Sequence, residues 1–217
     1  MLLVEDTLLL ATTEIEGKNI AGGWLDYILA GALLIDLTFA GNVRITEKGE
    51  EGVRANRAVV VPDTPRPDDP LLAEALDVVA RKPKWSTVNL VDRLARGLKK
   101  KVYPRLVAAE LVQRSERHVL GFTLVRYPAV DGSHERELLD AIDQVLLLGG
   151  EADAHTAALI GLLSGGDLLV KVVDRGRGID RRAVKKRGKQ LCEQHWAAKA
   201  AREAIQQMAA AAAAGAH

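Results

Sequence analysis

The chain has 217 residues, of which 48% are hydrophobic and 27% are charged, and these globular proportions exclude a fibre and a wholly disordered protein. Its 30 basic and 29 acidic residues nearly cancel, so a charged partner must be inferred from local patches. A single cysteine, Cys192, excludes an intramolecular disulfide and a Cys-rich zinc site. Glu5 and Asp6 interrupt the apolar N-terminus, unlike a secretory signal, and the apolar segments are short, so we expect a cytoplasmic protein that meets membranes only peripherally.

The hydrophobic pattern predicts a mostly helical fold with two β-hairpins. Apolar residues that recur every three or four positions indicate helices, and apolar residues that alternate with polar ones indicate hairpin strands. In chain order, we expect a helix around 8–10, a helix over 24–37, a hairpin over 43–61, a Pro-rich loop over 62–70, helices over 71–79, 87–96 and 98–109, a hairpin over 114–127, and helices over 135–148, 155–163, 167–173 and 180–208. We expect one domain over residues 1–208 and a frayed Ala-rich tail over 209–217.

The motifs of common enzyme and metal sites are absent from the sequence. The five histidines are scattered and none forms an HExxH motif, so we predict no metal site. No GxSxG motif surrounds a nucleophile, and Ser133 and His134 are interpreted as a turn and a solvated helix start. The Gly-rich pieces lack the Lys-Ser/Thr pair of a P-loop. These absences favour a protein that is not an enzyme and uses no cofactor.

Positive charge is concentrated in two segments. Residues 93–105 contain six basic residues and no acidic one. Residues 175–189 contain eight basic residues and one acidic residue, Asp180. The spacing in the second segment favours the solvated face of an amphipathic helix, opposite a stripe that includes Val184 and Leu191.

The first basic segment crosses a predicted junction between two helices. Arg96 precedes Gly97, which is placed to end one helix, and Lys99 and Lys100 lie in the first turn of the next. Free N–H groups and the helix dipole favour an anion at such a helix start. The junction therefore predicts either a phosphate-binding site or simple solvation of its charges.

Charge alone would give weak membrane binding. Three or four basic residues that face an acidic bilayer contribute about 3–4 kcal/mol in total. A second contribution is therefore expected: a specific grip on a phosphorylated headgroup, an apolar side chain in the interface, or self-association. Leu120, Phe122 and Leu124 of the second hairpin are candidates for the last two roles, although core packing is the role that we expect of them.

Several segments, taken in order, resemble the Golgi phosphoprotein 3 family. They are LLVEDTLLLA with EIEGK, AGALLIDLTFAGNVRI, DPLLAEALDVV, RLARGLKKKVYPRLVAAELVQRSERHVLGFTLVRYP and HWAAKAAREAI, and they span residues 1–206. The resemblance, to members of prokaryotic type, implies a mostly helical single domain, with a central helical bundle ringed by amphipathic helices and short hairpins. It also implies binding of phosphatidylinositol 4-phosphate at a basic pocket and an adaptor role.

The resemblance places the family's headgroup-binding residues at the basic junction. It implies that Arg96 and Lys99 take the place of the family's arginine pair, with Lys100 beside them. The family's pocket tryptophan matches Trp24 only with a shift, and Trp24 is either a ligand contact or a core residue. The resemblance also implies that the hairpin over 114–127 takes part in self-association.

Two other functions are compatible with the same residues. A basic helix followed by a hairpin also describes a winged-helix nucleic-acid-binding protein. The near-neutral net charge argues against that function, and the basic helix has few side chains suited to base edges beyond Arg105 and Gln113. A pure interaction scaffold is the second alternative. We predict a non-enzymatic peripheral membrane protein that binds an acidic lipid headgroup, with protein partners unspecified.

Overall fold

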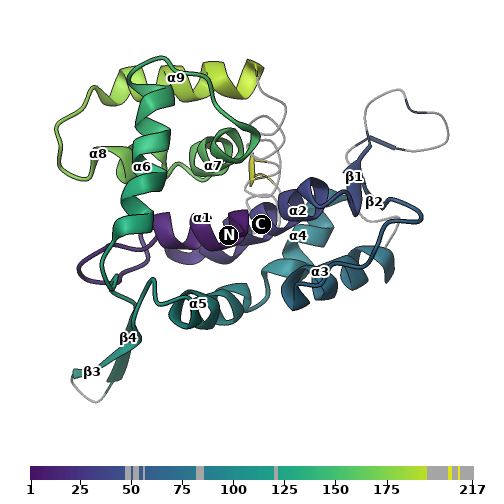
Figure 1. Cartoon of the computed structure of the whole chain (residues 1–217), viewed down its shortest axis with the longest axis horizontal. Coiled ribbons are helices and arrows are strands. Elements are labelled where there is room, and N and C mark those ends of the chain that lie inside the picture. Colours follow the sequence, from purple (N-terminus) through teal and green to yellow (C-terminus); the bar gives the residue numbers. More distant parts are fainter. Residues whose placement is uncertain are drawn as a thin grey trace.

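The protein, seen in a computed structural model, is mostly helical with two small antiparallel sheets (Figure 1). The structure describes residues 1–46, 50, 54–55, 57–81, 86–119, 122–194, 205–206 and 210. The helices are α1 (Leu3–Leu10), the short 3-10 helix η1 (Gly22–Trp24), α2 (Leu25–Phe39), α3 (Pro70–Arg81), α4 (Thr87–Ala95), α5 (Leu98–Ala108), α6 (Ser133–Leu146), α7 (Ala154–Gly165), α8 (Leu169–Asp174) and α9 (Arg181–Gln194). The hairpin strands are β1 (Val43–Ile45) with β2 (Ala58–Val60), and β3 (Ser115–Val119) with β4 (Phe122–Arg126).

Helix α2 forms the centre of the bundle. It packs against α1, α3, α4, α5 and α7, and most of its residues are buried. In Figure 1, α3, α4 and α5 lie on one side of α1 and α2, and α6 to α9 lie on the other. The stretch Gly22–Phe39 is long and apolar enough to cross a membrane, with a mean hydropathy of 1.3, but core helices meet the same criterion. The surrounding helices account for this apolar composition, and the predicted bundle architecture is confirmed.

The helices next to the central helix begin at recognisable caps. Ser86 accepts a hydrogen bond from the backbone N–H of Asn89 at the start of α4, at 3.3 Å. Asp69 caps α3 by accepting from the backbone N–H groups of Leu71 and Leu72, at 2.9 and 3.2 Å. These caps set where α3 and α4 start, and their inward faces then cover α2.

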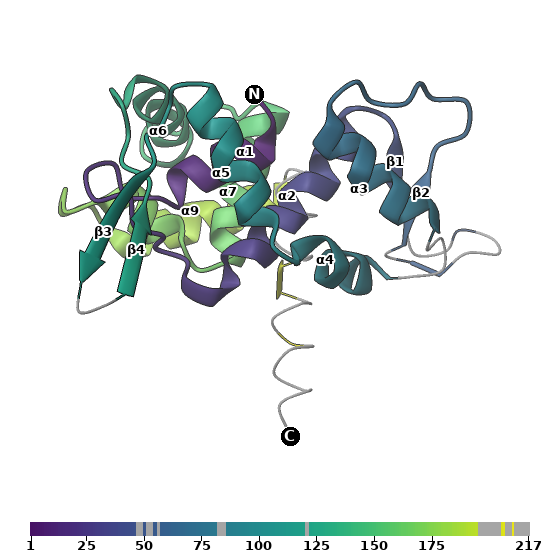
Figure 2. The ribbon, with the colours of Figure 1, turned by 90° about the horizontal axis from the view of Figure 1, so that it is seen from below.

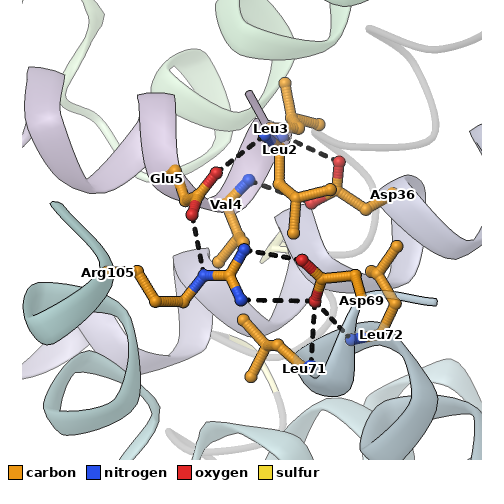
Figure 3. A network of polar contacts seen from close by, with 9 residues as sticks. All are labelled: Leu2, Leu3, Val4, Glu5, Asp36, Asp69, Leu71, Leu72 and Arg105. Atoms are coloured by element: carbon orange, nitrogen blue, oxygen red, sulfur yellow. Dashed lines mark hydrogen bonds and ion pairs between the residues drawn. The ribbon is translucent and has the colours of Figure 1, made fainter. Parts of the chain in front are cut away.

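A network of charged side chains fixes α1, α2, α3 and α5 relative to one another, as Figure 3 shows. Arg105 of α5 donates through Nε to Glu5 at 2.7 Å and through Nη2 to Asp69 at 2.7 Å. Asp36 of α2 accepts from the backbone N–H groups of Leu3 and Val4, at 2.7 and 3.0 Å. The free backbone N–H groups in the first turn of α1 thereby find acceptors inside the protein, and Arg105 holds α5 in one orientation.

A second network ties α1 to the other side of the bundle. Asp6 is buried, and its two carboxylate oxygens each lie 2.8 Å from a histidine Nε2, of His134 in α6 and of His155 in α7. Because a carboxylate only accepts hydrogen bonds, both Nε2 atoms donate. His134 lies at the start of α6, as expected, but it is partly buried against Asp6, so its interpretation as solvated was wrong. Among the described residues, no group of three or more His, Cys, Asp or Glu side chains is arranged to hold a metal ion.

The predicted elements are found with altered ends. The first helix begins at Leu3, because Asp36 caps it from α2, and not around residue 8. The helix expected over 180–208 is described as α9 to Gln194. Most of its predicted continuation, together with Leu120 and nearly all of the 209–217 tail, lies outside the described residues.

Candidate functional site

The basic junction is a sharp turn between α4 and α5. Arg96 is the C-cap of α4, and Gly97, with a φ of 71°, is the N-cap of α5. Glycine adopts this left-handed conformation without the penalty that a Cβ brings. The turn separates Arg96 from Lys99, so that the two side chains extend from different helices.

The start of α5 already has an anion from within the protein. Asp26, in the first turn of α2, accepts from the backbone N–H of Lys99 at 2.7 Å. Its other oxygen lies 3.6 Å from Lys99 Nζ. The anion that the helix start favours is therefore supplied by α2, and this N–H is not available to an external phosphate.

Arg96 is more weakly held than Lys99. Its guanidinium lies 3.4 Å from the Asp92 carboxylate, one turn earlier in α4, and its side chain is 68% exposed. The side chain of Lys100 makes no ion pair with any residue that the structure describes. Exposed pairs of this kind stabilise proteins by about 1 kcal/mol at most, so a stronger anion can displace Asp92 from Arg96.

Trp24 lies at the same junction and is not a core residue. It ends η1, two residues before Asp26, and is 45% exposed. Its ring centroid lies 5.8 Å from that of Tyr27, with the rings tilted by 50°. Of its two predicted roles, core packing is therefore wrong.

A hollow of about 360 Å³ opens beside the junction, between α3, α4 and α5, with α2 at its base. Its apolar wall is formed by Leu33, Leu71, Ala75, Val78, Leu94 and Leu98. Its charged residues are Arg81, Arg93, Arg96, Lys101, Glu74 and Asp77. The hollow thus combines an apolar wall with a mouth of mixed but mainly positive charge.

The two acidic residues of the hollow are already paired. Glu74 binds Lys101 across the mouth, and Asp77 binds Arg66 through two hydrogen bonds of 2.7 and 2.9 Å. Arg93 makes no ion pair with any of the described residues. The remaining charge at the mouth is therefore positive. An arginine guanidinium group can donate two parallel hydrogen bonds to the oxygens of a phosphate.

A comparison with protein-family models matches residues 3–208 of the chain to the Golgi phosphoprotein 3 (GPP34) model. The chain belongs to the Golgi phosphoprotein 3 family. A search of curated proteins finds no match to it. The match covers the bundle and both hairpins, in agreement with the resemblance carried by the sequence segments.

This Golgi phosphoprotein 3 family member brings its predicted site residues to one junction without gathering them in one hollow. Arg96 lines the hollow, whereas Lys99 faces Asp26 and is not among the lining residues. Lys100 and Trp24 are exposed nearby on α5 and η1 and also lie outside the lining.

Sequence reasoning missed Arg81 and did not assign Arg93 and Lys101 to a pocket. Arg81 lies at the C-terminal end of α3, and its sequence neighbours carry no anion-binding motif. The sequence did contain a signal that Arg93 belongs with Arg96. Arg93 precedes Arg96 by three residues on the polar face of α4, and this spacing puts both on one side of the helix. The packing of α3 against α4 then completes the mouth.

The second hairpin of this family member projects from the bundle (Figures 1 and 2). Phe122 is 74% exposed and Leu124 is 39% exposed, so the prediction that they pack in the core was wrong. Its base is anchored, because Tyr127 stacks on Tyr103 of α5 with 3.8 Å between ring centroids. The hairpin is therefore a fixed projection with an apolar tip.

The structure also weakens the winged-helix alternative. Helix α5, the proposed reading helix, buries Leu98, Val102 and Leu106 against the bundle. Arg105, one of the two candidate base-reading residues named from the sequence, is engaged by Glu5 and Asp69. An arginine held in this way is not free to contact a base edge in a DNA groove.

Proposed function

We propose that this protein binds an acidic lipid headgroup, with phosphatidylinositol 4-phosphate as the first candidate, and so attaches peripherally to a membrane. The observation that carries the proposal is the hollow, which Arg81, Arg93 and Arg96 line while its acidic residues are paired with Lys101 and Arg66. Membership of a family with lipid-binding and adaptor roles supports it.

The size and lining of the hollow suit a headgroup. Its volume of about 360 Å³ lies within the range of small-molecule sites. Arginine guanidinium groups form paired hydrogen bonds to phosphate oxygens, which select for a phosphomonoester over a diffuse negative surface. The apolar wall formed by Leu71 and Leu94 accommodates the carbon face of a sugar or inositol ring.

Residues around the hollow add attraction to the bilayer. Lys100 is exposed on α5 and contributes long-range attraction, worth about 1 kcal/mol at an acidic surface. Trp24 is placed to lie at the interface, where an indole ring combines an apolar body with a polar N–H group. In this proposal Lys100 and Trp24 act at the bilayer surface, whereas the resemblance implied that they contact the headgroup in the pocket.

The proposal is tested by flotation of the full chain with vesicles of different composition at one salt concentration. The panel contains phosphatidylcholine alone, phosphatidylcholine with phosphatidylinositol 4-phosphate, and phosphatidylcholine with phosphatidylserine at matched surface charge. We expect flotation with the phosphoinositide to exceed that with phosphatidylserine, and none with phosphatidylcholine alone. Equal flotation with all three vesicles, or binding to duplex DNA without any flotation, would refute the proposal.

A further inference from the structure

Helix α9 carries a second basic surface that the lipid site does not use. Its buried residues are Val184, Gly188, Leu191 and Cys192, and the helix packs against α7 and α8. Gly188 allows close packing, because a Cβ there would come within 2.6 Å of Leu169 Cδ2. The opposite face of the helix is exposed to solvent. This exposure confirms the expected solvated face.

Three cations form a row along that exposed face, which we call the α9 row: Arg182, Lys186 and Lys189. Their spacing of four and three residues places them on one side of the helix. None of the three makes an ion pair with the residues that the structure describes, whereas the neighbouring Lys185 pairs with Asp167 at 3.5 Å. The α9 row is therefore a line of three exposed cations without ion pairs among the described residues, and Glu193 follows one turn after Lys189 on the same side of the helix.

This arrangement is unfavourable for the isolated helix. Like charges one turn apart repel each other. Arg182 also lies in the first turn, where the helix dipole disfavours a cation, and Asp180 offsets part of this effect by capping the backbone N–H groups of Arg182 and Ala183. A bound polyanion would relieve both effects, whereas the solvent only screens them.

The α9 row lies on the far side of the molecule from the lipid site. Figure 1 shows α9 at the top and α3 and α5 at the bottom, with α1 and α2 between them, and Figure 2 looks onto α3, α4 and α5 with α9 behind. When the hollow faces a bilayer, α9 faces the aqueous phase. We therefore look for a partner in the aqueous phase and not for a second lipid surface, and this choice rests on the proposed attachment of the hollow to a membrane.

We propose that the α9 row binds an acidic polypeptide segment, rich in Asp and Glu, of a partner protein. Residues four apart on a helix are separated by about 6 Å along its axis and residues three apart by about 4.5 Å, whereas alternate residues of an extended chain are separated by about 6.6 Å. Carboxylates at every second position therefore match the step from Arg182 to Lys186, and the flexible lysine side chains span the difference at the shorter step from Lys186 to Lys189. The exposed residues described on α9 include no large apolar side chain to enter a bilayer. They also include no aromatic ring on which a base would stack.

The test measures binding of a fluorescent oligoglutamate peptide to the full chain by anisotropy, with oligoglutamine of equal length as the uncharged control. We expect the triple variant Arg182→Gln, Lys186→Gln, Lys189→Gln to weaken oligoglutamate binding about tenfold or more, because three surface charge contacts are lost. The double variant Arg93→Gln, Arg96→Gln keeps oligoglutamate binding. Thermal melts of both variants check that the fold is intact.

Three results would overturn the inference: oligoglutamate that binds no better than oligoglutamine, a triple variant that binds like the wild type, or single-stranded DNA that binds at the α9 row more tightly than the peptide. Vesicle flotation of the same variants separates the two proposals. Loss of flotation in the triple variant together with retention in the double variant would refute both. Retention of flotation in both variants, with peptide binding lost only in the triple variant, would refute the proposed lipid site alone.

Discussion

Asp26 has two effects at the junction between α4 and α5. Its Oδ1 caps α5 through the Lys99 N–H, and its negative charge offsets the Lys99 ammonium. The variant Asp26→Asn keeps an acceptor for the cap and removes the charge. We therefore expect it to bind acidic vesicles about fivefold more tightly, since one more net positive charge near the surface is worth about 1 kcal/mol. Vesicle titration measures the dissociation constant.

The variant Asp26→Ala is the matched control, because it removes both the charge and the cap. Its free energy of unfolding should fall by about 1 kcal/mol, which is the usual cost of a lost N-cap. Tighter vesicle binding in both variants would support the electrostatic role of Asp26. An Asp26→Asn variant that binds acidic vesicles more weakly than the wild type would contradict it.

Asp36 makes the stability of the fold depend on pH. Burial raises its pKa to about 7, although the hydrogen bonds from Leu3 and Val4 favour the charged form. An aspartate in the unfolded chain titrates near pH 3.9. The folded chain therefore binds more protons between these values, and the free energy of unfolding falls as the pH rises from about 4 to about 7. Asp36→Asn should flatten this decline in denaturant titrations across that range.

His155 extends the same trend to higher pH. Its hydrogen bond to Asp6 raises its pKa. The negative charges of Asp6, Asp36 and Asp153 also raise it, whereas burial lowers it. A raised histidine pKa gives stability that is complete below about pH 6.5 and is lost as the pH rises through the folded value. His155→Gln should remove this upper part of the decline. A wild-type chain that grows more stable from about pH 5 to about pH 8 would show that these groups do not control the trend.

At the scale of elements, the turn at Gly97 sets the angle between α4 and α5. Its φ is 71°, and a Cβ there would meet no atom within 4 Å, so Gly97→Ala adds backbone strain without a clash. We expect this variant to lose about 1 kcal/mol of unfolding free energy. Gly23→Ala is the control, since Gly23 has open space and no positive φ, and its cost should stay below about 0.5 kcal/mol. Equal costs in the two variants would contradict the assigned strain.

The second hairpin is the element proposed to mediate self-association. Phe122 pairs with Val119 at its tip, and Leu124 pairs with Arg117 on the same face. Because Phe122 is exposed, Phe122→Ser should change the unfolding free energy by less than about 0.5 kcal/mol and shift sedimentation toward the monomer. Val130→Ser removes an exposed apolar side chain outside the hairpin and should leave sedimentation unchanged. An unchanged sedimentation profile of Phe122→Ser would count against a hairpin interface.

The hydrophobic period predicts these elements well, because each helix and hairpin follows a local pattern. The Gly97 turn is also local and was placed correctly. The capping of α5 by Asp26 joins residues that are 73 positions apart, and no spacing rule within the chain indicates it. The hollow likewise depends on how α3 packs against α4, so its arginine from α3 could not be assigned from the sequence.

At the scale of the whole molecule, the apolar core separates two basic surfaces. The buried α1 and α2 lie between the helices that form the hollow and those that carry the α9 row (Figure 1). The near-zero net charge therefore hides two positive faces, because acidic residues such as Glu5, Asp6 and Asp36 are used inside the fold. A molecule built in this way can attach to a membrane on one side and meet an acidic partner on the other.

The most direct test of the account is a comparison of two double variants on vesicles that contain phosphatidylinositol 4-phosphate. Arg93→Gln, Arg96→Gln removes two cations from the mouth of the hollow, and Arg182→Gln, Lys186→Gln removes two cations from the opposite side. We measure the vesicle dissociation constant of each. The account predicts a loss of about tenfold or more for the first variant and near wild-type binding for the second. Equal losses in both variants, or none in the first, would contradict it.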